Sequence, residues 1–212
     1  MSLAALHKTV TYFYAFLGLA ALGLGDQLGP TALGLLFSGL VITWFIEGPL
    51  LHRPEYARLW SRVTLVVFSA QTIRGALFDA PMLPLGVELI GFLQLSRLAS
   101  RRSAVEHQQI AAIGFLHLIA ATLLSTDVEY GLLFLGFIVV TPWMLALTHF
   151  RREIERVASV GARDDAEAAA RALPMLESRG IVGPRFLLGI ASLALPLFFL
   201  TAAVFLVFPR VG

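Results

Sequence analysis

Long apolar runs separated by short polar stretches constrain this sequence more than any other feature. A helix that crosses the hydrocarbon core of a bilayer needs about 20 mostly apolar residues, with roughly 17 to 25 tolerated. The sequence therefore predicts an all-α integral membrane fold, a bundle of about seven transmembrane helices. The predicted spans cover residues 9–25, 30–47, 60–78, 82–96, 108–125, 129–149 and 186–208.

The composition supports this class of fold. Hydrophobic residues make up 58% of the 212 residues and charged residues 14%, which is far from the mixture that covers the core of a soluble domain. The net charge is +2, but the basic residues form short clusters between apolar runs, which argues against a nucleic-acid partner. Because the chain has no cysteine, it has no disulfide, no thiolate metal site and no cysteine nucleophile.

The Lys and Arg residues predict the orientation of the spans, because cytoplasmic loops are enriched in both. All but two of the 16 basic residues fall on one side of the predicted membrane, and the exceptions are Arg74 and Arg210. The loops on the opposite side carry acidic residues and no Lys or Arg: Asp26, Asp79, Asp127 and Glu129. We therefore expect a cytoplasmic N-terminus and an extracytoplasmic C-terminus.

Short outer loops predict that the first six spans pair as three helical hairpins, followed by a seventh helix. Residues 1–212 are interpreted as a single transmembrane helical domain, with residues 150–185 as a cytoplasmic connection between spans six and seven. Within this connection, Asp164 or Asp165 should cap a short helix through residues 166–173, and Pro174 should end or kink it. The connection is either a solvated extension of the sixth span or an interfacial helix on anionic lipid.

Two charged residues inside predicted spans are candidates for a site, because a charge at the centre of a membrane helix costs about 2.5 to 3.5 kcal/mol. Arg74 in the third span and Glu88 in the fourth both lie about 6 to 9 Å below the outer turn. We expect an intramembrane ion pair that neutralises both charges and holds the hairpin together. The alternative is a relay or a polar substrate cavity.

Uncharged polar residues complete the list of candidates within the bundle. His117 lies midway along the fifth span, and Gln71 and Gln94 lie within or near the ends of the third and fourth. We expect their side chains to hydrogen-bond to neighbouring helices rather than to bind a ligand. Glu106 and His107 begin the fifth span, where a solvated or helix-capping role is expected.

No signature of an enzyme or a cofactor site is found in the sequence. A zinc-binding His-Glu-x-x-His helix, a phosphate-binding glycine loop and a Gly-x-Ser-x-Gly elbow are all missing. The Tyr and Trp residues, among them Tyr12, Tyr14 and Tyr130, are interpreted as membrane-interface aromatics. The sequence predicts no catalytic residues, no metal ligands and no cofactor.

Two segments resemble a known family: "LQLSRLASRRSAVEHQQIAAIGFLHLIAATLLSTDVEY", residues 93–130, and "PLFFLTAAVFLVFPRVG", residues 196–212. They are similar to the N-terminal membrane domain of the bacterial transglutaminase-like (TgpA-type) membrane proteins. In that family a Phe-Pro-Arg-like exit leads into an extracytoplasmic domain with a Cys-His-Asp triad. The resemblance implies a membrane anchor or scaffold in the bacterial cytoplasmic membrane, whose partners are the lipid bilayer and a domain after residue 212. With no cysteine here, no catalytic residue is carried over.

Two alternative functions remain open at the level of the sequence. A small transport or channel subunit, acting through its own helix bundle, would use the Arg74 and Glu88 pair, with His117 at a similar depth. No repeat or pair of discontinuous helices supports that alternative. The other is a membrane-embedded lipid-handling enzyme with Glu88 as its base.

Overall fold

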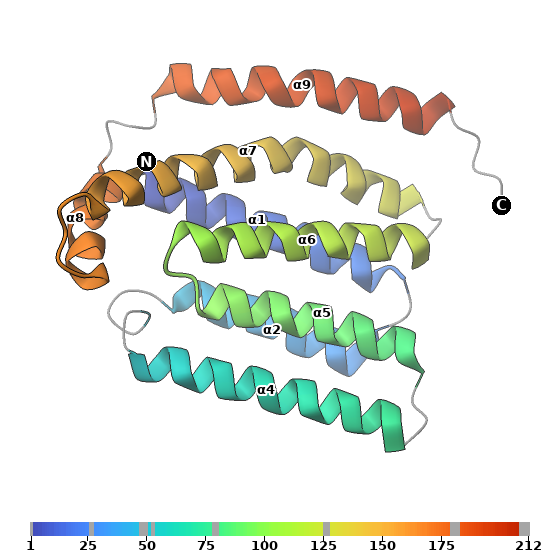
Figure 1. Cartoon of the computed structure of the whole chain (residues 1–212). Coiled ribbons are helices and arrows are strands. Elements are labelled where there is room, and N and C mark those ends of the chain that lie inside the picture. The colour runs from blue at the N-terminus through green and yellow to red at the C-terminus, as the bar shows by residue number, and fades with distance from the viewer. Residues whose placement is uncertain are drawn as a thin grey trace.

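The computed structural model describes residues 2–25, 28–46, 51, 54–77, 81–124, 128–178 and 183–207. Across these residues every regular element is a helix, which confirms the predicted all-α class (Figure 1). The helices are α1 (Leu3–Gly23), α2 (Pro30–Phe45), α4 (Pro54–Leu77), α5 (Met82–Ala99), α6 (Ala104–Leu124), α7 (Val128–Ser159), α8 (Asp165–Glu177) and α9 (Pro184–Val207).

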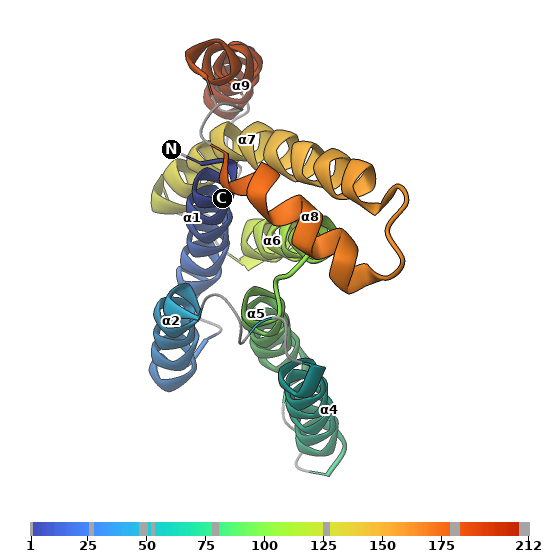
Figure 2. The same cartoon turned by 90° about the vertical axis from the view of Figure 1, so that its left-hand side faces the viewer.

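The long helices lie side by side in an elongated array, with α4 at one edge and α9 at the other (Figures 1 and 2). In the middle of the array, α1 packs against both α6 and α7, and α5 packs against α6. The outer contacts join α2 and α4 to α5, and α9 to α7. Helix α8 packs on α7 and α1 and crosses one end of the array (Figure 2).

Within the described part of the chain, three helices, α5, α6 and α7, are long and apolar enough to span a membrane, which indicates a membrane protein. The apolar stretches Pro30–Phe45 and Pro184–Leu200 are shorter. Large apolar side chains such as Phe45, Leu65 and Phe199 are exposed on the outside of the array, where lipid would cover them. A helix lies over each of the seven predicted segments, while the number of spans that cross a membrane stays a prediction.

The helix of the sixth predicted span continues into the predicted connection, since α7 runs beyond residue 149 to Ser159. The chain then reverses at Gly161, whose φ of 70° lies in the left-handed region that favours glycine. Asp164 caps α8 by accepting a hydrogen bond of 2.7 Å from the Glu167 backbone N–H, as predicted. Of the two expectations for Pro174, that it ends this helix is wrong, because α8 continues to Glu177, and that it kinks the helix stays a prediction.

Helices α1 and α6 approach closely because each places a glycine under an aromatic side chain of the other. A Cβ atom on Gly114 would collide with Cε1 of Tyr14, and one on Gly18 would lie 3.0 Å from Nδ1 of His117. The Tyr14 hydroxyl also donates to the carbonyl of Ala111 at 3.1 Å, which fixes the ring. Small residues at such crossings let helix backbones pack tightly in a membrane.

The same arrangement recurs between α2 and α5 with leucines in place of aromatic rings. A Cβ atom on Gly91 would lie 2.7 Å from Cδ1 of Leu36, and one on Gly39 would lie 2.5 Å from Cδ1 of Leu95. These two reciprocal contacts position α5 between α2 and α6. The interface aromatic role expected for Tyr14 is wrong, since this side chain is 2% exposed and belongs to the core of the bundle.

Replacing Gly114 with alanine should destabilise the protein, because the added methyl group would collide with a ring that the Ala111 carbonyl holds in place. Overpacking of this kind costs about 1 to 3 kcal/mol. Gly86→Ala is the matched control, since Gly86 lies inside α5 with no atom within 4 Å of its would-be Cβ. The control should gain up to about 1 kcal/mol from the higher helix propensity of alanine. Thermal unfolding in detergent measures both, and equal melting temperatures would contradict the crossing described here.

Candidate functional site

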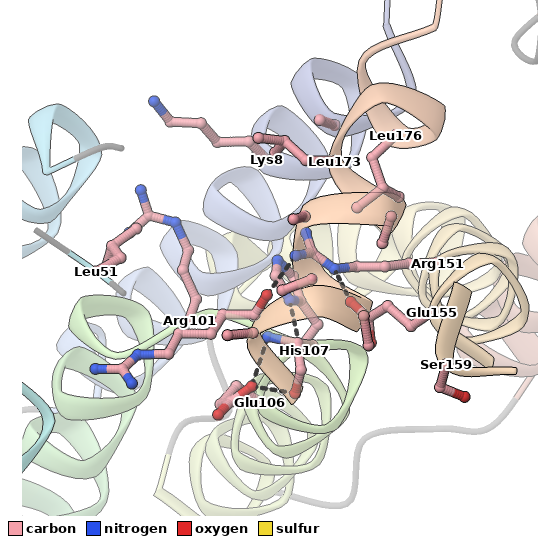
Figure 3. Close-up of a pocket in the computed structure, with 18 residues that line it drawn as sticks. Lys8, Leu51, Arg101, Glu106, His107, Arg151, Glu155, Ser159, Leu173 and Leu176 are labelled. Carbon is pink, nitrogen blue, oxygen red and sulfur yellow. Dashed lines mark hydrogen bonds and ion pairs between the residues drawn. The ribbon is translucent and has the colours of Figure 1, made fainter. Parts of the chain in front are cut away.

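A cavity of about 940 Å³, with both charged and apolar side chains in its lining, lies at one end of the bundle. It is bounded by the first turns of α1 and α6, the segment between α5 and α6, the last turns of α7, and α8, which covers it (Figure 3). The charged or polar side chains in its lining are Lys8, Arg101, Arg102, Ser103, Glu106, His107, Arg151, Glu155 and Ser159. Alanine and leucine side chains of α8 supply most of the remaining wall.

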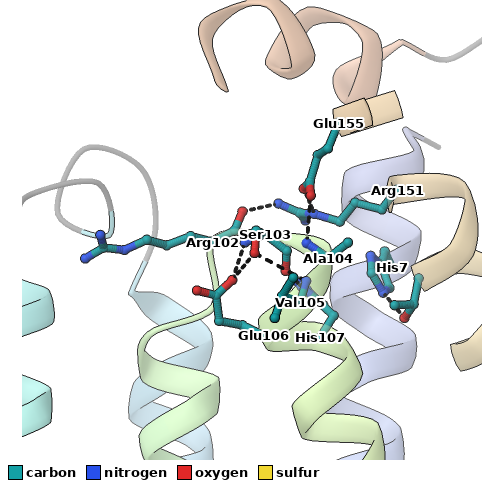
Figure 4. A network of polar contacts seen from close by, with 10 residues as sticks. His7, Arg102, Ser103, Ala104, Val105, Glu106, His107, Arg151 and Glu155 are labelled. Carbon is teal, nitrogen blue, oxygen red and sulfur yellow. Dashed lines mark hydrogen bonds and ion pairs between the residues drawn. The ribbon is translucent and has the colours of Figure 1, made fainter. Parts of the chain in front are cut away.

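Arg151 on α7 connects three segments at the cavity (Figure 4). Its Nε lies 2.8 Å from Oε1 of Glu155, and its Nη2 donates to the carbonyl oxygen of Arg102 at 2.5 Å. The other carboxylate oxygen of Glu155 accepts from the backbone N–H of Ala104 at 2.9 Å. This ion pair therefore holds the end of α7 to the segment before α6 and satisfies an N–H group in the first turn of α6.

Glu106 completes the start of α6. Its Oε2 accepts from the backbone N–H of Ser103 at 2.7 Å and also from the Ser103 hydroxyl (Figure 4). A carboxylate in the first turn also favours the positive end of the helix dipole. The predicted capping role of Glu106 is confirmed.

Two buried histidines stack beside this network, with ring centroids 4.1 Å apart: His7 of α1 and His107 of α6. His107 Nδ1 donates to the Ser103 carbonyl at 2.9 Å. His7 Nε2 lies 3.1 Å from the Thr148 hydroxyl oxygen, and that hydroxyl donates to the Met144 carbonyl at 2.7 Å. The Thr148 oxygen is therefore the acceptor and His7 Nε2 the donor. A solvated position for His107 is excluded, because its side chain is 3% exposed.

The electrostatic surroundings keep His7 neutral. Burial lowers the pKa of His7 well below its usual value, and the neighbouring His107 and Arg151 lower it further. His7 precedes the predicted first span and faces α6 and α7 through these neighbours. A neutral His7 is compatible with the cationic Arg151 beside it, whereas a protonated one would add a second positive charge to a buried site.

Arg101 is a structural residue that sequence reasoning treated as a topology signal alone. Its side chain is 7% exposed and donates to the carbonyl oxygens of Thr43 at 3.1 Å, Ile46 at 2.8 Å and Leu98 at 2.6 Å. These carbonyls lie at the C-terminal ends of α2 and α5, where helical carbonyl groups lack partners within the helix. The sequence signal for this structural role is the position of Arg101, two residues after the end of the apolar helix α5.

The residues predicted to carry a site are brought together only in part. Arg74 Nη1 lies 2.7 Å from Glu88 Oε2, so the two form an ion pair between α4 and α5. Gln71 joins them, donating to Glu88 at 2.9 Å and accepting from Arg74 at 2.9 Å. The Arg74 side chain is 51% exposed, so the group lies on the outer part of the array, away from its centre.

The other two predicted residues lie in the core. The ring of His117 packs on Gly18 of α1 and is fully buried. Gln94 is also fully buried, and its amide makes no hydrogen bond to the residues that the structure describes. The expectation of a hydrogen bond from Gln94 is therefore not met within the described part of the chain. Among the same residues, no group of three or more His, Asp or Glu side chains could hold a metal ion.

The ion pair between Arg74 and Glu88 predicts non-additive mutations. Arg74→Leu and Glu88→Leu should each lower the melting temperature in lipid nanodiscs, because each leaves one charge without its partner. The double variant should lose less than the sum of the two. Thr72→Leu, an exposed change on α4, controls for adding an apolar side chain outside the bundle. Additive losses would show that the pair does not contribute to stability.

The lowered pKa of His7 predicts a loss of stability in acid. An unfolded histidine binds a proton below about pH 6.5, and folded His7 resists protonation until the pH is lower still. Stability is therefore fully present above pH 6.5 and falls below it, by about 1.4 kcal/mol per pH unit for each proton excluded. His7→Gln should reduce this slope, whereas His149→Gln controls for loss of an exposed imidazole. Melting temperatures at pH 7.5, 6.5 and 5.5 that fall equally in wild type and His7→Gln would refute the assignment.

Comparison with known proteins assigns no relative to this fold and this cavity. No family model matches the chain, no curated protein matches it, and no solved structure matches it. The function is therefore inferred from the residues and from their arrangement.

Proposed function

We propose that this chain is a multi-pass helical scaffold in the bacterial cytoplasmic membrane, with its N-terminus inside and its C-terminus outside. It would anchor an extracytoplasmic transglutaminase-like domain that follows residue 212. The chain itself would carry no catalytic residue in that arrangement. The resemblance of residues 93–130 and 196–212 to the TgpA-type membrane domain motivates the attached domain, and residues 208–212 of that resemblance lie outside the described part of the chain.

One observation carries the proposed topology: basic side chains of the described residues gather at one end of the bundle. The ends of α5 and α7 and the starts of α1, α6 and α9 meet at the end where α8 lies (Figure 1). Lys8, Arg101, Arg102 and Arg151 line the cavity at this end. Cytoplasmic ends of membrane helices are enriched in such residues, which supports placing this end inside the cell. Arg74 lies near the opposite end of α4.

The packing at the centre of the bundle favours a scaffold function rather than a transport function. Tyr14, Leu19, Leu22, Phe137 and Met144 belong to one buried apolar cluster that fills the space between α1, α6 and α7. A close-packed interior of this kind holds helices in fixed positions. The transport alternative draws on Arg74 and Glu88, but this pair lies between α4 and α5 at the edge of the array.

Right-side-out membrane vesicles that contain the full gene product test this proposal. External protease should release a folded soluble fragment that begins near or beyond residue 212. A periplasm-active phosphatase fused after residue 212 should be active, and the same enzyme fused after Arg156 should be inactive.

The two measurements separate the parts of the proposal. Phosphatase activity at Arg156 alone would reverse the orientation. A correct orientation without any released fragment would refute the anchoring function and leave the bundle as the functional unit.

A further inference from the structure

We propose that the cavity beneath α8 binds a phosphate-bearing anion, with the phosphate held by Lys8 and Arg102 and the apolar part of the ligand against α8. This binding site goes beyond the scaffold function and does not depend on a domain after residue 212. Its chemistry is that of a phosphate ester, supplied either by a lipid headgroup or by a soluble phosphate compound.

The size and position of the cavity suit a ligand of this kind. Its volume of about 940 Å³ falls in the range of about 300 to 1,000 Å³ that is typical of ligand pockets. It lies at the helix ends, with α8 as one wall and the segment between α5 and α6 as another (Figure 3). A ligand can therefore present a polar group to the helix ends and an apolar group to α8.

The charges in the lining favour an anion. The lining includes four cationic side chains, Lys8, Arg101, Arg102 and Arg151, and two carboxylates, Glu106 and Glu155. Both carboxylates accept hydrogen bonds from N–H groups at Ser103 and Ala104, so their charge is directed at the start of α6. The described lining therefore keeps an excess of positive charge.

Each of the four cationic side chains that line the cavity also has a partner within the protein. The guanidinium of Arg101 binds the carbonyl groups that end α2 and α5, and that of Arg151 binds Glu155 and the Arg102 carbonyl. These two arginines are held in place as parts of the fold. Lys8 of α1, whose ammonium lies 4.4 Å from the centre of the Trp44 ring, and Arg102 of the segment between α5 and α6 line the cavity from two different walls. Cations on two sides of a cavity can contact a phosphate group together.

The wall that α8 provides is apolar and built from small side chains. Five alanines of α8 line the cavity, together with Leu173 and Leu176. Leu176 and Ala172 also pack into the apolar cluster that fastens α8 to α1 and α7, so the wall is fixed to the bundle. An alanine surface leaves room for a glycerol or acyl group beside the phosphate. Basic pockets at the cytoplasmic ends of membrane helices bind anionic headgroups in this way.

Binding is tested with the purified full-length protein in a zwitterionic detergent. The probes are dihexanoyl phosphatidylglycerol, dihexanoyl phosphatidylcholine and glycerol phosphate, each titrated while thermal unfolding is followed. The variants are Lys8→Gln with Arg102→Gln, the cavity-filling Ala169→Leu, and the control Arg152→Gln. Arg152 is exposed on α7 at the same end of the bundle and does not line the cavity.

Phosphatidylglycerol should raise the melting temperature of the wild type, and phosphatidylcholine should not. The double variant should raise the dissociation constant for phosphatidylglycerol about 10-fold or more, as expected for the loss of charge-assisted hydrogen bonds. Ala169→Leu should also weaken binding although it keeps every charge, and Arg152→Gln should stay within about twofold of the wild type.

The outcomes identify the source of the phosphate or overturn the site. Response to phosphatidylglycerol alone assigns a lipid headgroup, and an equal response to glycerol phosphate assigns a soluble phosphate ester. Equal responses to phosphatidylglycerol and phosphatidylcholine would refute the site. Variants that remain folded and bind phosphatidylglycerol as the wild type does would refute it as well.

Discussion

The close parallel crossing of α1 and α6 is the contact on which the rest of the structure depends. Tyr14 lies over Gly114, and His117 lies over Gly18, so the two helices have one register along their length. Two turns toward the N-termini, the same register brings His7 against His107. A shift of either helix by one residue would separate all three pairs. The interior packing of the bundle thus determines the geometry of its polar end.

The polar end is organised mainly by backbone groups that the helices leave unsatisfied. Helix ends expose N–H and carbonyl groups that need partners when they are buried. Glu106 and Glu155 supply acceptors at the start of α6, and Arg101 supplies donors at the ends of α2 and α5. The charged side chains therefore complete the secondary structure and, in the same positions, surround a cavity. That dual role explains why so many ionised groups remain ordered beside apolar helices.

The sequence predicted the parts of this fold that depend on local patterns. Apolar runs located the helices, and the Asp164 cap before the alanine-rich stretch located α8. The Arg74 and Glu88 pair could be anticipated because a short hairpin brings residues of equal depth together. The stacking of His7 on His107, in contrast, joins residues far apart in the sequence, and no local signal identifies it. The same holds for the three carbonyl partners of Arg101, which exist only once α2 and α5 are adjacent.

The separation in sequence between α1 and its main partners affects how the bundle assembles. Helices α4 and α5 are consecutive and can pack as soon as both have entered the bilayer. Helix α1 packs mainly on α6 and α7, which are synthesised much later. Contacts between distant segments form slowly because a long loop must close first. The contacts of α1 through Tyr14 and Thr11 can therefore form only when α6 and α7 have joined the centre of the bundle.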